Sequence, residues 1–502
     1  MGVFDHILLG FQVTFQPANL LFCAIGVLVG TLVGVLPGIG PVGAMALLLP
    51  ATFKGTPTSS IIMLAGVFYG AQYGGSTTSI LVNIPGEASS VITCLDGYQM
   101  ARQGRAGPAL GIAAWGSFIA GTISVIGLML IASSLSKAAL SFGPPEYFAL
   151  MCTGLIIVTY LAQQSVLKAL MMALVGIIIG NAGMDIVTGL PRFTFGIDEL
   201  TDGVGIIPLV IGLFGIGEVF DNLDQELENR QIFQTRIKNL WPSLKDWGES
   251  KWAILRGTII GFFLGILPGG SVVLCSFVSY AVEKKVSRNP QKFGKGAIAG
   301  VAGPESANNA AAQGCMIPLF SLGIPTNVMM AMLFSALIIH GIQPGPLFIR
   351  DNPDIFWGLI ASLYLGNVLL LILNLPLIGI WIQVLKVPYR ILFPLILLFC
   401  LIGAYTTNNS SIDLLVMLLF GTAGYLMKKF VYEGAPLVLA FVLGPMLEQA
   451  LRQSLLMSQG SFMIFISRPI SGTALGIALV LLLSTIFPYM KKRRQKYEEF
   501  KE

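Results

Sequence analysis

The sequence predicts an all-α, polytopic membrane protein of about 10–14 membrane segments, arranged as two inverted repeats with broken helices and re-entrant hairpins. Three observations predict this fold class: an apolar composition, long apolar segments interrupted by proline and glycine, and a motif that occurs twice. Of the 502 residues, 55% are hydrophobic and 11% are charged. A soluble globular chain averages about 25% charged residues, so the composition indicates a chain that lies largely in a lipid bilayer.

The charged residues are concentrated outside the apolar segments. Three short ranges, 221–251, 281–296 and 490–502, hold 26 of the 55 charged side chains. The rest of the chain contains apolar segments that approach the ~20 residues needed to cross a bilayer. The predicted membrane segments are 20–36, 59–73, 107–135, 145–162, 166–182, 204–220, 252–268, 315–340, 355–385, 388–404, 411–427, 435–447 and 462–489.

Several functional classes are excluded by motifs that the sequence lacks. The net charge of +5 comes without a basic stripe that carries interleaved aromatic residues, so no nucleic-acid partner is expected. Six cysteines lie far apart with no CxxC pair, and histidine occurs only at His6 and His340, so no cofactor, firm metal site or triad is predicted. The absence of a Walker A motif argues against ATP hydrolysis. The first 19 residues lack the basic region of a cleavable signal peptide, so the first apolar segment is expected to be retained.

Lysine and arginine in short loops predict which loops are cytoplasmic. The 281–296 loop holds five basic residues against the single acid Glu283, and the C-terminal residues hold five more between 491 and 496. Both are expected in the cytoplasm. The 221–251 range has six acids and five bases, which is typical of a solvated linker. The predicted domains are a first membrane repeat at 1–220, the linker at 221–251, a second membrane repeat at 252–489 and a basic cytoplasmic tail at 490–502.

A glycine motif occurs once in each half of the chain. Glycines spaced four residues apart lead into LeuProGly in both copies, and the second copy follows the first by 231 residues. One such run is typical of close helix packing, but two copies in order indicate a duplication. A looser match relates 73–88 to 313–328, which lies 240 residues later. The repeated glycines are Gly26, Gly30, Gly34 and Gly38, and then Gly257, Gly261, Gly265 and Gly269.

The charges around the two copies predict that the repeats are inverted. The loop after the first copy, 51–58, has Lys54 as its only basic residue, whereas its counterpart at 281–296 is strongly basic. Loops on opposite sides of the membrane would differ in this way.

Proline and glycine interrupt the apolar segments at four places, 35–38, 83–86, 266–269 and 323–326. Broken helices survive at membrane depth only where protein or a water-filled cavity satisfies the freed backbone groups. Secondary transporters place their sites where such helices from two repeats meet. The breaks therefore predict a binding site that the two halves share.

Two polar motifs, GGSTTS at 74–79 and GPESANN at 303–309, are each expected at the start of a helix. Free backbone N–H groups and the positive end of the helix dipole would there bind a carboxylate without a permanent positive charge. The structural alternative is helix capping together with hydrogen bonds between helices. The predicted substrate-binding residues are Gly38, Gly40, Ser76, Thr77, Thr78, Asn83, Gly86, Gly269, Gly270, Asn308, Asn309, Thr326 and Asn327.

Six acidic residues flank or enter the apolar segments, where ionisable groups are costly and usually functional. Glu87 and Glu305 adjoin the Pro-Gly motifs and are the predicted carriers of a coupling proton or Na⁺. The alternative is that an acid is paired with an arginine at an interface. The other four acids are Asp96, Asp185, Asp413 and Glu448, and the arginines near them are Arg102, Arg105, Arg192 and Arg452.

The most distinctive stretches are GVLPGIGP (34–41), YGGSTTSILVNIPGEASSVITCLDGYQMARQGRAG (73–107), GMDIVTGLPRFTFGIDELTDG (183–203), GVAGPESANNAAAQG (300–314) and GIPTNVMMAMLFSALIIHGIQPGPLF (323–348). Together with ArgProIle at 468–470, they resemble the large membrane subunit, TctA, of the tripartite tricarboxylate transporter family. The resemblance runs nearly from end to end of the chain.

The resemblance implies a bacterial inner-membrane carrier that works with a small membrane subunit and a periplasmic solute-binding protein. It implies citrate and related carboxylates as substrates and a proton or sodium gradient as the driving force. The chain departs from the family pattern at Gln99, where a proline is usual, and at 323–327, where GIPTN replaces a string such as GIPGS. Because Thr326 and Asn327 adjoin the predicted site, the particular substrate stays open.

The predicted function is therefore a secondary active, gradient-driven carrier of carboxylates. Duplicated broken helices, neutral groups suited to anions and the lack of an ATPase motif all favour it. Two alternatives stay open from the residues. One is a membrane-embedded enzyme that uses paired acids such as Glu87 and Glu305, and the other is a passive anion channel.

Overall fold

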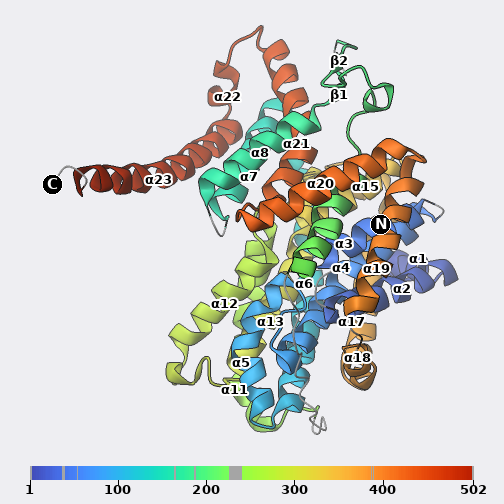
Figure 1. Ribbon diagram of the computed structural model, residues 1–502, viewed down its shortest axis with the longest axis vertical. Coiled ribbons are helices and arrows are strands. Elements are labelled where there is room, and N and C mark those ends of the chain that lie inside the picture. The colour runs from blue at the N-terminus through green and yellow to red at the C-terminus, as the bar shows by residue number, and fades with distance from the viewer. Residues whose placement is uncertain are drawn as a thin grey trace. The chain divides into compact units, whose positions relative to one another are not determined.

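A computed structural model describes residues 3–36, 40–53, 55–162, 165–185, 188–224, 240–385, 387 and 389–499. These residues are mostly helical, and Figure 1 follows them from α1 in blue to α23 in red. The strands among them are β1 (Gly183–Met184) and β2 (Pro191–Arg192), which pair antiparallel in one small hairpin. The predicted helical class is confirmed.

The helices vary widely in length, as expected for a chain with interrupted apolar segments. The first half contains α1 (Val3–Thr14), α2 (Pro17–Val35), α3 (Gly40–Thr52), α4 (Pro57–Val82), η1 (Ala88–Ser90), α5 (Val91–Arg102), α6 (Ala106–Ala139), α7 (Pro144–Tyr160), α8 (Val166–Gly180), η2 (Asp198–Leu200), α9 (Ile206–Val210), the π-helix η3 (Ile211–Ile216) and α10 (Gly217–Asp224). The second half contains α11 (Leu244–Ile266), α12 (Val272–Val286), η4 (Pro290–Lys292), α13 (Ala299–Gly314), α14 (Met316–Leu322), α15 (Val328–Ile339), α16 (Phe348–Asp351), α17 (Pro353–Asn374), α18 (Ile378–Val384), α19 (Tyr389–Asn408), α20 (Ser411–Lys429), α21 (Gly434–Met457), α22 (Met463–Ser467) and α23 (Pro469–Glu499).

Five helices of the described ranges are long and apolar enough to cross a bilayer on their own: α2, α6, α17, α20 and α21. The chain is therefore a multi-pass membrane protein. Other predicted segments are divided, since 315–340 becomes α14 and α15, and 355–385 becomes α17 and α18. The total of 10–14 membrane segments stays a prediction.

Several helices lie outside the predicted membrane segments. They are α1, α3, α5, α12, α13 and α16. For α13 the reason is its small and polar residues, which lower its hydropathy although 300–314 are all buried. The predicted linker 221–251 also contains the start of α11, because Ser243 and Asp246 form a capping box there. Residues 225–239 of that linker lie outside the described ranges, and α23 runs through most of the predicted tail.

The chain forms two compact units. Unit 1 comprises residues 1–137 and 205–426, and unit 2 comprises 138–204 and 427–502. In unit 2, α21 packs against α7 and α8, and α23 packs against α7. Each unit contains residues of both predicted repeats, so the boundaries of the compact units differ from those of the predicted repeats. The predicted repeat boundaries stay a prediction.

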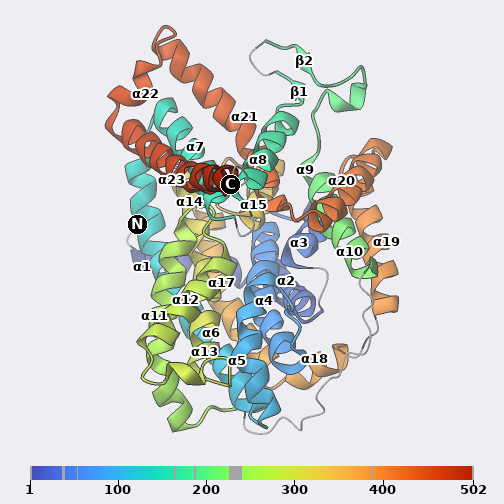
Figure 2. The ribbon, with the colours of Figure 1, turned by 60° about the vertical axis from the view of Figure 1, so that its left-hand side comes forward.

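Unit 1 contains two glycine-mediated helix pairs: α2 lies against α4, and α11 lies against α13 (Figure 2). An added Cβ on Gly30 would lie 2.5 Å from the Val67 carbonyl oxygen, and one on Gly261 would lie 2.0 Å from that of Ala307. The glycines of the two pairs differ by 231 in number and their contact partners by 240. The remaining matched contacts are Gly26 with Met63, Gly34 with Ala71, Gly257 with Gly303, and Gly265 with Ala311.

Corresponding helices of the two halves end in the same backbone conformations, with α14, which follows α13, matching the end of α4. α4 ends at Asn83, with φ 59°, and α14 ends at Gly323, with φ 72°; both residues are left-handed. The N-cap residue that follows is Glu87 in the first half and Asn327 in the second. α2 and α11 each end in an extended leucine, Leu36 and Leu267 respectively. Each of these pairs keeps the offset of 240 or 231 residues.

The two breaks of the second half contact each other directly. The Gly269 N–H donates a hydrogen bond of 3.0 Å to the Thr326 carbonyl oxygen. In the first half, an added Cβ on Gly86 would lie 2.0 Å from the Gly34 carbonyl oxygen, so that break rests on the end of α2. The breaks at 83–86 and 323–326 therefore each contact the C-terminal end of the glycine-rich helix beside them, α2 or α11.

Candidate functional site

α4 and α13 bury polar side chains on every face. All residues of α13 from Gly300 to Gly314 are buried, and so are those of α4 from Ser59 to Leu81. A buried polar group is costly unless it is hydrogen-bonded. The polar residues of these two helices must therefore satisfy one another or a bound solute.

Glu305 of α13 lies at the centre of these polar residues and is fully buried. Its carboxylate accepts hydrogen bonds from Ser76 of α4 at 2.5 Å, from Thr93 of α5, and from the Asn308 amide at 3.3 Å. All three donors are neutral. Within the described ranges, neither a lysine nor an arginine nor a histidine pairs with this carboxylate. Glu305 is thus a buried acid held by hydroxyl and amide groups alone.

Glu87 joins the same hydrogen-bond network through Ser89. The Ser89 hydroxyl lies within hydrogen-bond distance of the Glu87 carboxylate and 2.9 Å from Gln72 Oε1. It also accepts from the Asn308 amide at 3.3 Å. Because a hydroxyl carries one hydrogen, Ser89 donates to either Glu87 or Gln72 at a time. Asn308 therefore links the two predicted coupling acids, since it contacts both Ser89 and Glu305.

Asn309 extends the network to α6. Its amide Nδ2 lies 2.8 Å from Ser117 Oγ, 3.1 Å from the Glu305 carbonyl oxygen and 2.7 Å from Asn308 Oδ1. The polar side chains thus come from η1 and four helices, all in unit 1. We call this set the Glu305 network, and its members are Gln72, Ser76, Glu87, Ser89, Thr93, Ser117, Glu305, Asn308 and Asn309.

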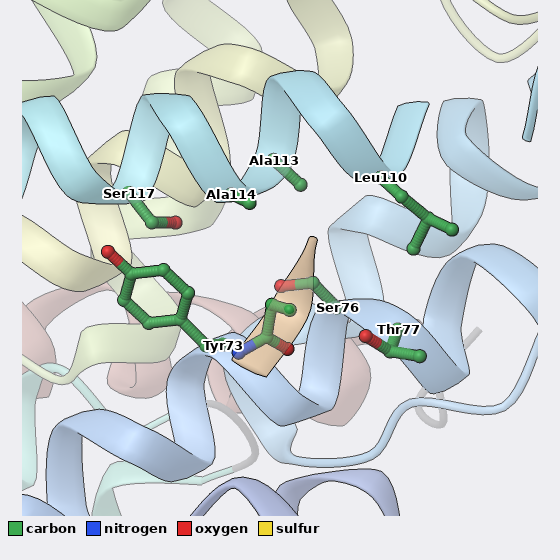
Figure 3. Close-up of a pocket in the computed structure, with 8 residues that line it drawn as sticks. Tyr73, Ser76, Thr77, Leu110, Ala113, Ala114 and Ser117 are labelled. Atoms are coloured by element: carbon green, nitrogen blue, oxygen red, sulfur yellow. The ribbon is translucent and has the colours of Figure 1, made fainter. Parts of the chain in front are cut away.

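A small cavity borders the network between α4, α6 and α17 (Figure 3). It has room for about one water molecule. Sites for small-molecule ligands usually enclose about 300–1,000 Å³, so a citrate-sized solute enters only after the helices move. The lining residues are Tyr73, Ser76, Thr77, Leu110, Ala113, Ala114, Ser117 and Asn374.

The prediction that both polar motifs begin helices was wrong. The 74–79 motif lies near the C-terminal end of α4, which begins at Pro57 behind the capping residue Thr56. The 303–309 motif lies inside α13, which begins at Ala299. Backbone N–H groups beyond the first turn are bonded within the helix, so neither motif offers them to an anion. The side chains of the two motifs, and not their backbone N–H groups, are therefore available to bind a solute.

The structure brings together some of the predicted substrate-binding residues and separates others. Ser76, Asn308 and Asn309 lie in the Glu305 network, and Thr77 lines the cavity beside it. The Thr78 hydroxyl instead donates to the Val35 carbonyl oxygen at 2.6 Å. The remaining first-half residues are Asn83, which is exposed, Gly86, which packs on Gly34, Gly40 at the start of α3, and Gly38, which lies outside the described ranges.

The predicted residues at the two breaks of the second half, 266–269 and 323–326, form a separate group. Gly269 is bonded to Thr326, as described above, and Gly270 is buried next to it. Asn327 accepts a hydrogen bond of 2.9 Å from the Met330 N–H and so caps α15. Within the described ranges, the Glu305 carboxylate is bonded to Ser76, Thr93 and Asn308 and to no member of this group.

Five residues near Glu305 were missed from the sequence. Gln72 had a local signal, since it lies one helical turn before Ser76 on the same face of α4. Ser89 lies two residues from Glu87, within reach of its side chain. Thr93 lies in the distinctive 73–107 stretch, where nothing singled it out, and Ser117 and Asn374 lie in no motif, so the packing of distant segments reveals all three.

Two of the other acids, Asp185 and Glu448, are paired with arginines, as the structural alternative predicted. In unit 2, Arg192 pairs with Asp185 and with Glu448, and Arg452 pairs with the same two acids. The hydrogen bond from Arg192 to Glu448 raises the pKa of the Arg192 guanidinium above its usual range. In unit 1, Asp96 accepts from Tyr280 and two backbone N–H groups, and Asp413 accepts from Asn408.

Comparison with known sequences gives matches over most of the chain. Residues 20–439 match the profile of the Tripartite tricarboxylate transporter TctA family. An uncharacterised 52.8 kDa protein in the TAR-I ttuC′ 3′ region of Agrobacterium vitis is 50% identical over 496 residues, which cover 99% of each chain. An uncharacterised protein in the TAR-II ttuC′ 3′ region of the same organism is 50% identical over 236 residues, covering 47% of this chain and 98% of its own. No solved structure matches.

Proposed function

The chain belongs to the tripartite tricarboxylate transporter TctA family, and we propose that it is the translocating subunit of a secondary active uptake system. The substrates are tricarboxylates such as citrate, or related carboxylates, and the driving force is a cation gradient. The family is one of transporters, not enzymes. Its implied partners are a small membrane subunit and a periplasmic solute-binding protein that delivers the solute. The location is the bacterial inner membrane.

The observation that carries this proposal is the position of Glu305. An ionised carboxylate that is buried without a cationic partner is strongly unfavourable, even with neutral hydrogen-bond donors around it. A proton or a metal cation would remove that cost. A substrate carboxylate near Ser76 or Asn308 would be repelled by the charged form of Glu305 and accepted after neutralisation. Cation and substrate would then promote each other's binding, which is the thermodynamic requirement for symport.

We assign the binding of the substrate carboxylates to two groups of neutral residues, one in α4 and α13 and the other at the breaks of the second half. Thr77 of α4 and Asn308 and Asn309 of α13 supply hydroxyl and amide donors, beside Ser76, whose own hydrogen is donated to Glu305. The second group is Thr326 and Asn327 with the backbone at Gly269 and Gly270. Opening of the helices around the small cavity would bring the solute into contact with these groups.

The matched glycine contacts and helix ends support the proposed architecture of two inverted repeats, 1–220 and 252–489, with re-entrant hairpins at the breaks. In this arrangement the 281–296 loop and the C-terminus are cytoplasmic. Single cysteines at Ala51 and Ser287, in a background without the six native cysteines, test it. They are expected to react with an impermeant thiol reagent from opposite faces of the membrane. Labelling from the same face would make the repeats parallel.

The transport activity is tested by reconstitution in liposomes with the two partner subunits. Labelled citrate is expected to accumulate under an imposed ion gradient, and an ionophore that collapses the gradient is expected to abolish accumulation. Unchanged accumulation after collapse of all gradients would refute the proposal. Conductance without accumulation would indicate a channel, and a chemically altered solute, detected by mass spectrometry, would indicate an enzyme.

Two substitutions test the assigned carboxylate ligands. Thr77→Val and Asn309→Leu each remove a neutral hydrogen bond to a charged ligand, which is worth roughly 1.5–3 kcal/mol, or about 10- to 150-fold in affinity. The half-saturating citrate concentration is expected to rise on that scale. Thr78→Val is the matched control, because its hydroxyl is bonded to the backbone of α2. Near-normal uptake in both variants would move the carboxylate site to the breaks.

A further inference from the structure

Asn374 carries an unsatisfied oxygen at the edge of the small cavity. It is the last residue of α17 and is 4% exposed. Its Nδ2 donates to the Leu370 carbonyl oxygen at 2.9 Å, whereas its Oδ1 has no hydrogen-bond partner in the described ranges. The side chain lines the cavity. Because a buried, unpaired amide oxygen is costly, a ligand in the cavity that accepts its lone pairs would stabilise this arrangement.

The other polar groups of the cavity also present oxygen. Figure 3 shows the hydroxyls of Ser76 and Thr77 beside the cavity and Ser117 across from them on α6. The Ser76 hydrogen is directed to Glu305 or to the Gln72 carbonyl oxygen, and the Ser117 hydroxyl lies 3.3 Å from the Glu305 carbonyl oxygen. Ser76 Oγ therefore keeps its lone pairs for a ligand, and Ser117 Oγ, which accepts from the Asn309 amide at 2.8 Å, keeps one. The polar groups of the lining are thus oxygen acceptors, which suit a cation, while Leu110, Ala113 and Ala114 make the rest of it apolar.

The electrostatic surroundings favour a cation as well. The Glu305 carboxylate lies directly behind Ser76 Oγ, at 2.5 Å. A cation in contact with that hydroxyl, at the ~2.4 Å typical of hard cations with oxygen ligands, would lie within about 5 Å of the carboxylate. The C-terminal end of α17, which carries a partial negative charge, ends at Asn374 on the same cavity.

We propose that this cavity is a Na⁺ site, with Ser76, Ser117 and Asn374 as its protein ligands and Thr77 beside them. The room for about one water molecule fits a dehydrated Na⁺. Neutral oxygens and a single nearby carboxylate suit a hard, singly charged ion. The described residues contain no group of three or more His, Cys, Asp or Glu side chains that would hold a divalent or transition metal.

This inference rests on the proposed function and specifies its coupling ion. The bound Na⁺ compensates the charge of Glu305, so that the Asn308 and Asn309 amides can exchange their hydrogen bonds within the network for bonds to a carboxylate substrate. It also assigns a role to Asn374 and Ser117, which the sequence did not single out.

Equilibrium binding of radioactive sodium to the purified full-length chain tests the site. Asn374→Leu and Ser117→Ala each remove an oxygen ligand and are expected to weaken Na⁺ binding at least about tenfold. Asn374→Asp keeps an oxygen in place and is expected to bind Na⁺ as tightly as the wild type or more tightly. Ser124→Ala is the matched control. Ser124 lies on the same helix, is 2% exposed against 1% for Ser117, and does not line the cavity.

Thermal unfolding of each variant, measured in the same detergent, shows whether it is folded. Wild-type Na⁺ affinity in folded Ser117→Ala and Asn374→Leu would overturn the proposal, and so would equal losses in Asn374→Leu and Asn374→Asp. Citrate accumulation driven by a proton gradient in sodium-free buffer would also overturn the Na⁺ site. That last result would leave the proposed transport function intact, so the two failures are distinguishable.

Discussion

The two broken-helix regions of unit 1 have the same backbone and different chemistry. In the first, α2 packs on α4, which ends at the left-handed Asn83; in the second, α11 packs on α13, and α14 ends at the left-handed Gly323. Glycines at matching positions let each pair of backbones approach closely. Close packing is therefore a property of both regions.

The acidic residues do not follow this correspondence. Glu87 caps η1, whereas Asn327 occupies the matching position before α15. Glu305 lies 240 residues after Ala65, which has no polar side chain. Both acids nevertheless enter one hydrogen-bond network, through Ser89 and Asn308. The comparison teaches that backbone geometry is repeated while charge is concentrated at one site, where it can act on a single solute and a single ion.

The largest expected effect separates the two acids. Glu305→Gln replaces an acceptor of three hydrogen bonds with an amide whose NH₂ group faces the same donors. Gradient-driven citrate uptake is expected to fall by more than about 100-fold, equivalent to ~2.7 kcal/mol. Glu87→Gln, at the edge of the network, is expected to lower it by about tenfold or less. Equal losses would mean that the acids act as an equivalent pair.

The second prediction concerns the glycine contacts. Gly261→Ala and Gly30→Ala would place a Cβ 2.0 Å and 2.5 Å from a backbone oxygen, so the helices must separate. Each is expected to lower the free energy of unfolding by about 1–3 kcal/mol, with Gly261→Ala the larger. Thermal unfolding in detergent measures both. Gly248→Ala on α11, where nothing lies within 4 Å, is the control and should stabilise slightly. A destabilised control would locate the effect outside the packing.

The third prediction compares the left-handed residues that end the helices. Gly323→Ala combines a positive φ with a Cβ 2.6 Å from the Pro344 carbonyl oxygen, so a loss of about 1–2 kcal/mol is expected. Asn83→Gly removes a side chain from an exposed left-handed position and should change stability by less than about 0.5 kcal/mol. Denaturation of both variants tests this order. A more stable Gly323→Ala variant would contradict the assigned geometry.

The smallest effect is expected at the second-half cap. Asn327→Ala removes the hydrogen bond from the Met330 N–H and should cost about 1 kcal/mol, whereas Asn327→Ser should recover most of it. If Asn327 also binds substrate, as proposed, Asn327→Ser will raise the half-saturating citrate concentration without a matching loss of stability. Parallel changes in both measurements would limit Asn327 to capping.

Apolar length predicted the helices that depend on it. Segments 107–135, 166–182 and 411–427 agree closely with α6, α8 and α20. The same criterion missed α13, because a helix surrounded by protein is not required to be apolar. Its polar residues were instead noticed as a motif, and they were placed at a helix start because sequence alone does not locate the first turn when α13 begins with Ala299 and Gly300.

The sequence by itself determined the membrane class, the family, the positions of the breaks and the four-residue glycine spacing. These follow from composition and from local patterns that are read within a few turns of helix. Only the tertiary structure decided that Ser76, Thr93 and Glu305 share one network, that Thr78 belongs to the packing of α4 on α2, and that Asn374 faces the cavity. The physical reason is distance along the chain. Ser76 and Glu305 are 229 residues apart, and a hydrogen bond between them depends on how whole helices pack.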